Sequence, residues 1–516
     1  MDEIRNEWDG RMTSIPRMCV HVNVHDILDF LGVEKEGIEN FSVSGLASDN
    51  REVSEENIFI ALSGQTVHGA KFAVDACRRG AIAVMSDTAG EKFLHNINVP
   101  VIIVEHLRDK LGGLCDFVYG KPSARMNSFA VTGTNGKTTT TFMINHILTS
   151  LGRKSGLIGT VATKMGDDVI DSMMTTPQPV DLQNTLAWFH HEGASDFVME
   201  VSSHALALKR TQPILFSVAG FTNLTQDHLD FHESFDDYYS AKALLFNPMN
   251  SSRAVIMIDD EWGKKLYDDA CVHMGKENVC SLSASSADNK ADFIISDIEI
   301  RNGQTYFSLY SRKQRCLRLS TTLPGEFNIF NAALAALMVY KSGVSFDDLD
   351  QMDISPHVPG RMEVVAKRPR VIVDFAHNAD ALEKAMRTLI ETTQGRLIVL
   401  TGSAGERDQG KRADMGYIVA KYADVAVITD DDPHREDPAR IRRDILDGMT
   451  DAQGEVKEIP DRCKAIEYAI RIAEASDTVL LAGRGHEKYQ YVADGLVELD
   501  DREEARKAIA LYHEGV

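Results

Sequence analysis

Short apolar runs alternate with segments of helical periodicity along most of the chain. Runs such as FAVTG, FVMEVS, SVAGFTNL and AVIMIDD occur in the middle of the sequence, and VIVDFAH, LIVLTG, VAVITDD and TVLLAGRG occur near its end. Strands that alternate with helices are typical of βα units on a mostly parallel sheet. The pattern therefore predicts an α/β protein.

Two turn-rich stretches divide this pattern. GKPSARMN, residues 120–127, and ISPHVPGR, residues 354–361, each precede a strong strand signal, and clusters of Gly, Pro and Ser mark breaks between elements. A chain of 516 residues has room for about three domains at the usual size. We expect domains at about 1–125, 126–356 and 357–516.

The most specific motif lies near the start of the middle domain. The apolar residues 129–131 predict a strand, GTNGKT (133–138) follows, and apolar positions then recur on one helical face. In a strand-to-helix loop the backbone N–H groups favour an anion, Lys137 can reach terminal phosphates, and the Thr138 hydroxyl can bind Mg²⁺. Val131 stands where the usual pattern has its first glycine. We interpret the segment as a phosphate-binding loop.

Three residues downstream suit a metal and nucleotide centre. Glu200 ends the apolar strand FVMEV, His228 lies in NLTQDHLDFH, and Lys242 lies in the helical run YYSAKALLF. A strand-end carboxylate is well placed to hold Mg²⁺ or its waters. Each residue also has an ordinary structural explanation, as a strand-end acid, a surface histidine or a solvent-exposed helix lysine. Because all three follow a phosphate loop, we favour a functional role for them. His228 and His232 have the spacing of a zinc pair, but HExxH is absent, so zinc is the weaker interpretation.

Composition narrows the class of protein. A formal charge of −22 argues against a nucleic-acid partner, because phosphate contacts along a nucleic acid need a basic face. The charged N-terminus MDEIRNEWDG and the lack of a run of 18 apolar residues predict a cytoplasmic protein without membrane insertion. Seven cysteines without a CxxC pair suit a reducing compartment.

The motifs resemble, in order, those of the Mur ligase family over about residues 45–500, and most closely those of members that add a diamino acid to UDP-N-acetylmuramoyl-L-alanyl-D-glutamate. The matching stretches are GTNGKTT, TTPQPVDLQ, MEVSSHALALKR, NLTQDHLDFH, YYSAKALLF, LPGEFNIFNA, VPGRMEVV, VDFAHNADALEKAM, GERDQGKR and GRGHEKYQ. The resemblance implies an N-terminal α/β substrate domain, a central P-loop ATPase domain with a mostly parallel sheet, and a C-terminal Rossmann-like α/β domain. It also implies ATP-dependent amide ligation in peptidoglycan precursor synthesis, through an acyl phosphate. ATP, Mg²⁺, the UDP-linked dipeptide and a free diamino acid would bind, and we expect a monomer.

The resemblance assigns roles to individual residues. The catalytic residues would be Lys137, Glu200, His228 and Lys242, and the metal residues would be Thr138, Glu200, His228 and Lys242. Lys242 would be carbamylated, which turns a cation into an anion that can approach a metal. The ATP positions would be Gly133, Thr134, Asn135, Gly136, Lys137, Thr138, Thr139, Asn328, Asn331, Arg361 and Asp374, with His377 and Asn378 beside them. The UDP-substrate positions would be Asn50, which replaces a serine, and Gln65, Thr66, Thr175, Thr176, Ser202 and Arg210.

The acid-rich stretch DDDPHREDP, residues 430–438, follows the apolar run VAVIT. Open α/β sheets bind ligands at the carboxyl ends of their strands. The stretch shares that edge with other strand-end residues, and the amino-acid site is expected to contain Arg407, Asp431, Asp432, His434, Gly483 and Glu487.

This segment also bears on which amino acid is used. Ligases that take meso-diaminopimelate typically have D-N-P-R here, with the arginine on the distal carboxylate, whereas lysine-adding relatives resemble D-D-P-N. An imidazole at position 434 lacks the guanidinium fork, and Asp432 would favour a free ammonium. We predict L-lysine, or L-ornithine, over meso-diaminopimelate. A shift of the loop by one residue would place Arg435 in the arginine position.

Two other functions share part of these signals. A ligase like folylpolyglutamate synthase has the same phosphate loop, but HALALKR and GRGHEKYQ favour the muramyl substrate. A non-catalytic ATP-binding regulator would not need Lys137, Glu200, His228 and Lys242 together. Because the two substrates would bind on separate domains, we also expect the last domain to close onto the ATP site.

Overall fold

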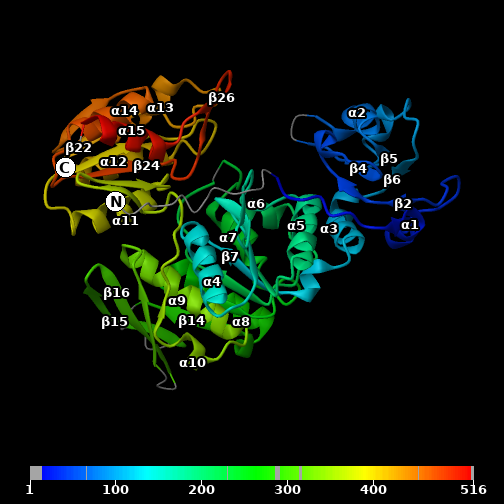
Figure 1. Ribbon diagram of the computed structural model, residues 1–516, viewed down its shortest axis with the longest axis horizontal. Helices are drawn as coiled ribbons and strands as arrows, with labels where there is room; N and C mark the ends of the chain where they lie inside the picture. Colours follow the sequence, from blue (N-terminus) through cyan, green and yellow to red (C-terminus); the bar gives the residue numbers. More distant parts are fainter. Residues whose placement is uncertain are drawn as a thin grey trace.

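The computed structural model describes residues 14–64, 67–228, 230–284, 291–312, 316–450 and 452–512. The two predicted UDP-site residues Gln65 and Thr66 lie outside these ranges. Three sheets dominate the structure, and they occupy successive parts of the chain (Figure 1). In Figure 1 the N-terminal part lies at the upper right, the middle part in the centre and the C-terminal part at the upper left.

The N-terminal part contains a parallel sheet in the order β3-β4-β5-β6 and a separate pair β1-β2. Its strands are β1 (Val22–Asn23), β2 (Ser42–Val43), β3 (Gly45–Ala47), β4 (Asn57–Ala61), β5 (Ala81–Ser86) and β6 (Val101–Ile103). Its helices are α1 (Val24–Leu31), α2 (Ala73–Arg78) and α3 (Leu107–Val118). In α1 the buried residues Val24, Ile27, Leu28 and Leu31 follow helical spacing, so one face packs against the sheet.

The middle part is built on a twelve-stranded sheet in the order β10-β9-β8-β11-β7-β12-β13-β14-β15-β16-β17-β18. Its strands are β7 (Asn127–Thr132), β8 (Ser155–Ile158), β9 (Ala162–Met165), β10 (Asp168–Asp171), β11 (Asp196–Glu200), β12 (Val218–Phe221), β13 (Ala254–Met257), β14 (Val279–Ser283), β15 (Phe293–Arg301), β16 (Gln304–Ser311), β17 (Cys316–Thr321) and β18 (Met352–Asp353). In this spatial order, the consecutive strands β8, β11, β7, β12, β13, β14 and β15 pair in parallel. Antiparallel hairpins extend the sheet beyond both β8 and β15.

Helices cover both faces of this sheet. They are α4 (Lys137–Ser150), α5 (Pro179–His191), α6 (Ser203–Ala207), α7 (Phe235–Ala243), α8 (Glu261–Met274), α9 (Glu326–Lys341) and α10 (Phe346–Leu349). One core joins α4 and α9 to the sheet, and a second core joins α5, α7 and α8 to it. Burial on both faces explains why the central strands are continuously apolar rather than alternating.

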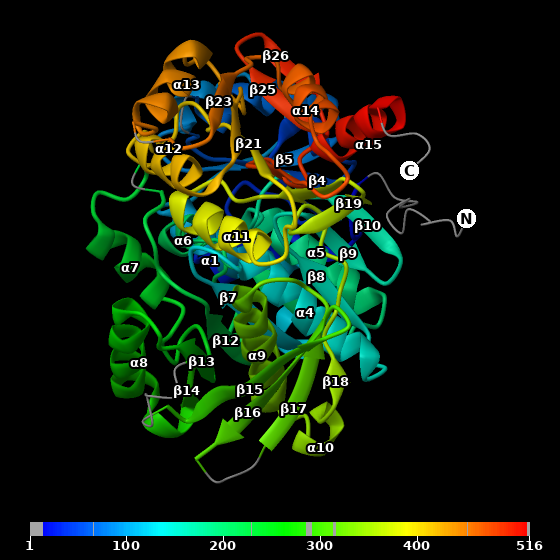
Figure 2. The same ribbon diagram turned by 90° about the vertical axis from the view of Figure 1, so that its left-hand side faces the viewer.

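The C-terminal part has a six-stranded sheet in the order β19-β20-β24-β21-β22-β23, of which only the β19 pairing is antiparallel (Figure 2). Its strands are β19 (Glu363–Lys367), β20 (Arg370–Asp374), β21 (Leu397–Thr401), β22 (Val425–Ile428), β23 (Glu455–Glu458) and β24 (Thr478–Ala482), with a hairpin of β25 (Tyr489–Val492) and β26 (Gly495–Glu498). Its helices are α11 (Ala379–Ile390), α12 (Lys411–Tyr422), α13 (Pro438–Asp447), α14 (Arg462–Arg471) and α15 (Asp501–Tyr512). The expected α/β architecture with mostly parallel sheets is confirmed.

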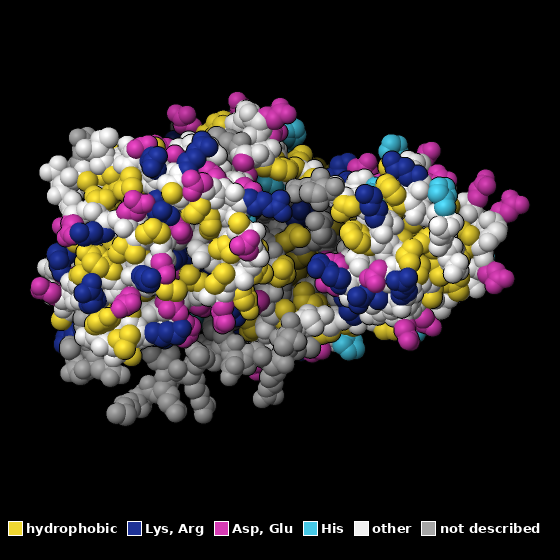
Figure 3. Space-filling view, turned by 90° about the horizontal axis from the view of Figure 1, so that it is seen from above, with side chains coloured by type: hydrophobic (Ala, Val, Ile, Leu, Met, Phe, Trp, Pro, Cys, Tyr) yellow, Lys and Arg dark blue, Asp and Glu magenta, His cyan; other side chains and the backbone are white. Residues whose placement is uncertain are grey.

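Acidic and basic side chains are interspersed on the face seen in Figure 3 rather than gathered by sign. In the described part of the chain, no helix combines the length and the apolarity that crossing a membrane requires.

Candidate active site

The predicted phosphate loop connects β7 to α4, which begins at Lys137. Gly133 and Gly136 have φ angles of +147° and +87°, which side chains other than glycine rarely adopt. A Cβ atom on Gly133 would also lie 1.9 Å from the Thr222 hydroxyl. The loop is held against the end of β12, because the Thr134 N–H donates to the Asn223 carbonyl at 2.9 Å. The strand, turn and helix that the sequence predicts are all present.

Two predicted lysines meet at one carbonyl of this loop. Lys137 Nζ donates to the Gly133 oxygen at 3.0 Å, and Lys242 Nζ, from α7, donates to the same oxygen at 2.8 Å. Lys242 is buried and lies 4.4 Å from the centre of the Tyr238 ring. Burial lowers the pKa of both ammonium groups, and the neighbouring Lys137 lowers that of Lys242 further. The loop therefore brings two lysine side chains to one carbonyl, and burial disfavours the charged form of both, most strongly for Lys242.

Glu200 lies at the carboxyl end of β11 and is fully buried. Its carboxylate accepts hydrogen bonds from the Thr138 hydroxyl at 2.9 Å, from the Thr160 N–H at 2.7 Å and from the Thr160 hydroxyl at 3.0 Å. Among the described residues it forms no salt bridge, so this buried carboxylate has only neutral hydrogen-bond donors. Carboxylate and hydroxyl oxygens are the ligands that Mg²⁺ prefers, and Thr138 and Glu200 fit such an ion.

His228 lies beside this cluster with a φ angle of +57°, an uncommon conformation that proteins often keep at functional sites. Its ring is 5.1 Å from the His204 ring. Burial, together with the nearby Lys137 and Lys242, lowers the pKa of His228 to about 3 even though Asp227 opposes the shift. A neutral imidazole is the form that binds metals.

The predicted nucleotide residues of α9 extend the site away from the phosphate loop. Asn331 Oδ1 accepts from the Thr140 hydroxyl at 3.3 Å, and Asn331 Nδ2 donates to Asn328 Oδ1 at 3.2 Å. Asn328 in turn donates to the Pro324 carbonyl at 2.7 Å. A row of amide groups therefore leads from α4 to the start of α9.

Arg361 connects the phosphate loop to the C-terminal domain. Its Nη2 atom lies 3.4 Å from the Thr138 hydroxyl, and its guanidinium stacks over Phe375 at 4.2 Å from the ring centre. Asp374 holds the same segment, because its carboxylate accepts from the N–H groups of Met362 at 2.7 Å and Ala376 at 2.8 Å. Both residues therefore fix the linker next to the loop.

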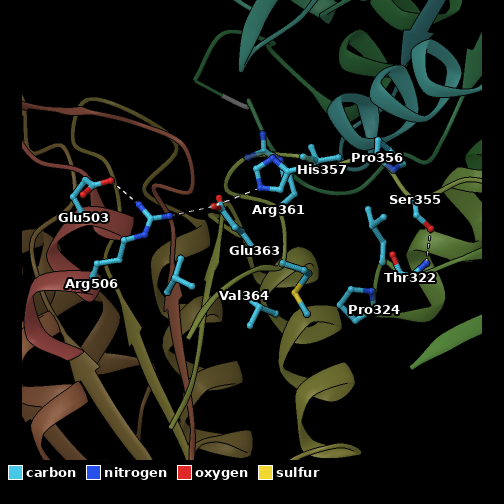
Figure 4. A pocket seen from close by; sticks show the side chains of 14 residues that line it. Thr322, Pro324, Ser355, Pro356, His357, Arg361, Glu363, Val364, Glu503 and Arg506 are labelled. Carbon is cyan, nitrogen blue, oxygen red and sulfur yellow. Dashed lines mark hydrogen bonds and ion pairs between the residues drawn. The ribbon is translucent and has the colours of Figure 1, made fainter. Parts of the chain in front are cut away.

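Arg361 also lines a cavity of about 660 Å³ between the middle and C-terminal domains (Figure 4). Pro324 and His357 lie on one side of it and Arg506, from α15, lies on the other. Glu363 between them lies 3.6 Å from His357 and 3.9 Å from Arg506. The cavity is bounded by the linker between the two domains, and Arg361 is the predicted nucleotide residue that lines it.

Four of the predicted UDP-substrate residues come together beside Glu200. The Thr176 hydroxyl donates to the Glu200 backbone carbonyl at 2.9 Å and accepts from the Ser202 N–H at 3.1 Å. Arg210 Nη1 donates to the Thr176 carbonyl at 3.1 Å, and the Thr175 hydroxyl lies 3.0 Å from that of Thr160. Asn50 lies in the N-terminal domain instead, where it donates to Asp75 at 2.7 Å.

The acids of the stretch 430–438 are tied to arginines from distant segments. Asp430 is paired with Arg442, and Glu436 is paired with Arg412 at 2.8 Å. Asp437 caps α13 by accepting from the Ala439 N–H at 3.0 Å. These three acids therefore hold the loop in place.

Asp431 and Asp432 share one fully buried cation. Arg484 is paired with Asp432 and lies 3.6 Å from Asp431. Gly483 allows this approach, since its φ angle is +115° and a Cβ there would lie 2.7 Å from Asp431 Oδ2. Glu487 lies 3.7 Å from Arg484, and burial followed by the charge of Asp431 raises its pKa to about 8. Sequence reasoning missed Arg484, although it lies inside the quoted motif GRGHEKYQ.

His434 and Arg435 differ in their surroundings. The His434 N–H donates to the Tyr491 carbonyl at 3.0 Å, and its ring lies 5.3 Å from the Tyr491 ring of β25. Arg435 is exposed and forms no salt bridge within the described residues. The predicted Arg407, which follows β21 in the same C-terminal domain, lies 3.9 Å from Asp230 of the middle domain.

Comparison with known proteins places these features in a family. Three family models match the chain: "Mur ligase family, catalytic domain" over residues 42–119, "Mur ligase middle domain" over residues 131–339, and "Mur ligase, glutamate ligase domain" over residues 360–485. This chain belongs to the Mur ligase family. The resemblance seen in the sequence is thereby confirmed, and so is the fold of three Mur ligase domains.

Relatives and solved structures agree with this membership. UDP-N-acetylmuramoyl-L-alanyl-D-glutamate–2,6-diaminopimelate ligase of Streptomyces coelicolor is 36% identical over 94% of this Mur ligase and 96% of its own length. The enzyme of the same name from Geobacillus thermodenitrificans is 38% identical over 91% of the chain and 95% of its own length. A solved structure of a ligase of that name is 28% identical, with a TM-score of 0.63 over 96% of this chain and 100% of the other. The MurF ligase from Thermotoga maritima in complex with ADP has a TM-score of 0.62 at 17% identity, over 91% of this chain and 97% of the other, and shows the shared fold.

Proposed function

We propose that this Mur ligase uses ATP to join a diamino acid to the D-glutamyl carboxylate of UDP-N-acetylmuramoyl-L-alanyl-D-glutamate. The observation that carries the proposal is the position of Glu200. Its carboxylate contacts Thr138 of the phosphate loop, and its backbone carbonyl contacts Thr176 of the UDP-substrate set. One strand end therefore brings the phosphate site next to the residues expected to hold the acyl substrate.

The chemistry follows from this proximity. The γ-phosphoryl group of ATP passes to the D-glutamyl carboxylate, the amine of the amino acid attacks the acyl phosphate, and phosphate leaves as the amide forms. Negative charge builds on phosphoryl and carboxyl oxygens in each step, and Lys137 lies where it can balance that charge. Thr138 and Glu200 would hold one Mg²⁺ ion and His228 would hold a second, and these ions would supply Lewis-acid polarisation of the phosphoryl oxygens.

The cavity in Figure 4 is the proposed place of the adenosine moiety. Arg361 supports this assignment, because the same side chain lines the cavity and lies within 3.4 Å of the Thr138 hydroxyl. The row of Asn331 and Asn328 offers amide donors and acceptors between the loop and the cavity. We also propose domain boundaries near residues 125 and 356, in line with the extents of the three sheets.

Lys242 is proposed to carry a carbamate. Its lowered pKa favours the neutral amine, which is the nucleophilic form toward carbon dioxide, and Lys137 would face the resulting anion. The modification is testable by ¹³C NMR of the protein in ¹³C-bicarbonate, in which a carbamate resonance should be present in the wild type and absent in Lys242→Ala.

For the amino acid we propose 2,6-diaminopimelate. The relatives that cover most of this chain carry that substrate in their names, so the comparisons favour the alternative to the L-lysine predicted from the sequence. One premise of the lysine prediction is also weaker, because the Asp432 carboxylate is already paired with Arg484. L-lysine remains a second candidate for a specific reason: among the described residues, Asp431 and Asp432 have the same ion-pair partner, Arg484, which leaves negative charge for a substrate ammonium.

A panel of amino acids tests both proposals. The purified protein would be given ATP, Mg²⁺ and the UDP-dipeptide with meso-diaminopimelate, L-lysine or L-ornithine in turn, and phosphate release would be measured. The expected result is a preference of about 100-fold or more in kcat/KM for diaminopimelate. L-lysine and L-ornithine lack its distal carboxylate, and a polar site left without its substrate partner loses several kcal/mol of binding free energy. The reverse preference would establish lysine instead. Phosphate release with none of them, but with a folate and glutamate, would overturn the muramyl assignment.

A further inference from the structure

The C-terminal domain touches the phosphate loop through the start of helix α11. Asn135, in the loop itself, donates to Asp380 of α11 at 2.8 Å and accepts from Asn378 at 3.2 Å. Figure 2 shows α11 along the boundary between the two domains. Most of the remaining polar contacts at this place converge on one residue of the middle domain, Asp227.

Asp227 is buried, with 3% of its surface exposed, and its carboxylate faces three groups of the C-terminal domain. Asn378 Nδ2 donates to Asp227 Oδ2 at 3.2 Å, and His377 Nε2 lies 3.4 Å from the same oxygen. Lys411 Nζ lies 3.7 Å from Oδ1. Oδ1 also accepts from the His228 N–H at 3.0 Å within its own domain. One carboxylate therefore joins the loop of His228 to two segments of the neighbouring domain.

These segments begin two helices of the C-terminal domain. Asn378 is the N-cap residue of α11, directly after β20, and Lys411 is the first residue of α12. The strands β21, β22 and β24, whose carboxyl ends lead to the amino-acid residues, lie in the same sheet as β20. Fixing the starts of α11 and α12 therefore fixes the sheet edge that carries Asp431 and Gly483.

We propose that Asp227 is an interdomain positioning residue that sets the C-terminal domain against the phosphate loop, so that the bound amine meets the acyl group. The proposal rests on the proposed function for its kinetic consequence, but its geometric consequence does not depend on the substrate. A point-like carboxylate that serves three donors specifies one pose more sharply than an apolar contact of the same size would.

The charged groups at this contact favour an arrangement of the two domains that can form and separate again. Two basic side chains of the C-terminal domain face the buried Asp227 carboxylate, because Lys411 Nζ lies 3.7 Å from Oδ1 and His377 Nε2 lies 3.4 Å from Oδ2. Lys411 is itself buried, and Asp227 is its ion-pair partner within the described residues. When the domains separate, both charges regain water, which makes the pair sensitive to the loss of either partner.

The alternative role of Asp227 is purely local, as a support for the His228 loop. Substitutions on the two sides of the contact separate these roles, because Lys411 belongs to the other domain and, among the described residues, its ion-pair partner is Asp227 and not His228. The variants are Asp227→Asn, Asp227→Glu and Lys411→Met. Lys421→Met is the matched control, since it removes an exposed cation from the same helix α12.

Small-angle scattering of the full chain, with and without ATP, gives the first readout. Asp227→Asn and Lys411→Met should both give a larger radius of gyration than the wild type, with melting temperatures close to that of Lys421→Met. Profiles of both variants that superimpose on the wild type under both conditions would overturn the proposal. This readout stands even if no amino acid is accepted, so it is distinguishable from a failure of the proposed function.

Steady-state kinetics with the best amino acid gives the second readout. Both variants should lower kcat/KM for the amino acid about 100-fold, because a misplacement near 1 Å costs that much, while the affinity for ATP measured by calorimetry changes less than about threefold. Asp227→Glu should recover part of the loss. If Asp227→Asn weakens ATP binding in the presence of Mg²⁺ and Lys411→Met has no kinetic effect, Asp227 acts only through His228 and the proposal fails.

Discussion

The phosphate loop at residues 133–138 and the acid-rich loop at residues 430–438 occupy equivalent places in two domains. Each follows a buried parallel strand, β7 or β22, and each precedes a helix at the carboxyl edge of its sheet. We propose that the first loop binds phosphate through backbone groups and one lysine, which the local sequence specifies. The second is rich in charge, but Arg412, Arg442 and Arg484 take up most of that charge.

The difference shows that the function of a charged residue is harder to predict from the sequence than that of a glycine-rich turn. A glycine-rich turn between a strand and a helix has the same geometry wherever it occurs, so its function is visible in a few residues. A carboxylate attracts a ligand only when the fold leaves it unpaired. Arg484 lies about fifty residues from Asp432 in the sequence, and their pairing turns a negative loop into a scaffold.

The largest expected effect is at the phosphate loop. Lys137→Ala should lower kcat by about 1,000-fold or more, because it removes the fixed positive charge nearest to the transferred phosphoryl group. Phosphate release measures the effect, and Lys154→Ala, which removes an exposed lysine paired with Glu192, is the control that should retain activity. Full activity of Lys137→Ala would mean that the loop does not hold the phosphates as proposed.

The second largest expected effect is a loss of stability at Arg484, the buried cation that pairs with the acid-rich loop. Arg484→Met should lower the free energy of unfolding by about 3–5 kcal/mol, because Asp431 and Asp432 remain buried without a counter-charge. Urea unfolding at neutral pH measures the loss. The loss should shrink in acid, where the two carboxyl groups become protonated, and a loss that is independent of pH would instead indicate a packing defect.

The pH dependence of stability at Glu487 tests the same cluster through a smaller expected effect. Its folded-state pKa of about 8 lies above the ordinary value of an unfolded glutamate, so the folded form binds the proton more tightly. The stability that this group contributes is fully present below about pH 4.3 and is lost as the pH rises toward 8. Glu487→Gln should therefore lose less stability than the wild type between these values, as measured by chemical unfolding at a series of pH values. Parallel pH profiles would contradict the raised pKa.

The smallest expected effect on stability is at Arg435. Arg435→Ala should change the free energy of unfolding by less than about 0.5 kcal/mol, because the side chain is exposed and outside the network of ion pairs. Its effect on the KM of the amino acid is the informative quantity. A rise in KM for diaminopimelate with unchanged stability would show that Arg435 contacts the substrate, whereas a rise only in His434→Ala would assign that contact to His434.

Much of the fold could be predicted from the sequence, because apolar runs that are buried on both faces leave a clear signal. The strand and helix around Lys137, the apolar strand that ends at Glu200 and the α/β organisation of the last domain were all visible in this way. Most of the site residues were reached through the resemblance to Mur ligases, not through periodicity. Asp227, Lys411 and Tyr491 were missed, since residue type alone does not show which side chains of distant segments meet.

The sequence by itself determined the phosphate loop, the α/β class and the family, because each depends on local backbone geometry or on an ordered series of motifs. Only the tertiary structure decided which charges remain available at the site. It paired Asp431 and Asp432 with Arg484, about fifty residues away in the chain, it paired Asp430 and Glu436 with arginines of two helices, and it placed Asp227 against the neighbouring domain. The physical reason is that a charge interacts through space, so its partners are chosen by the packing of distant segments rather than by its neighbours in the sequence.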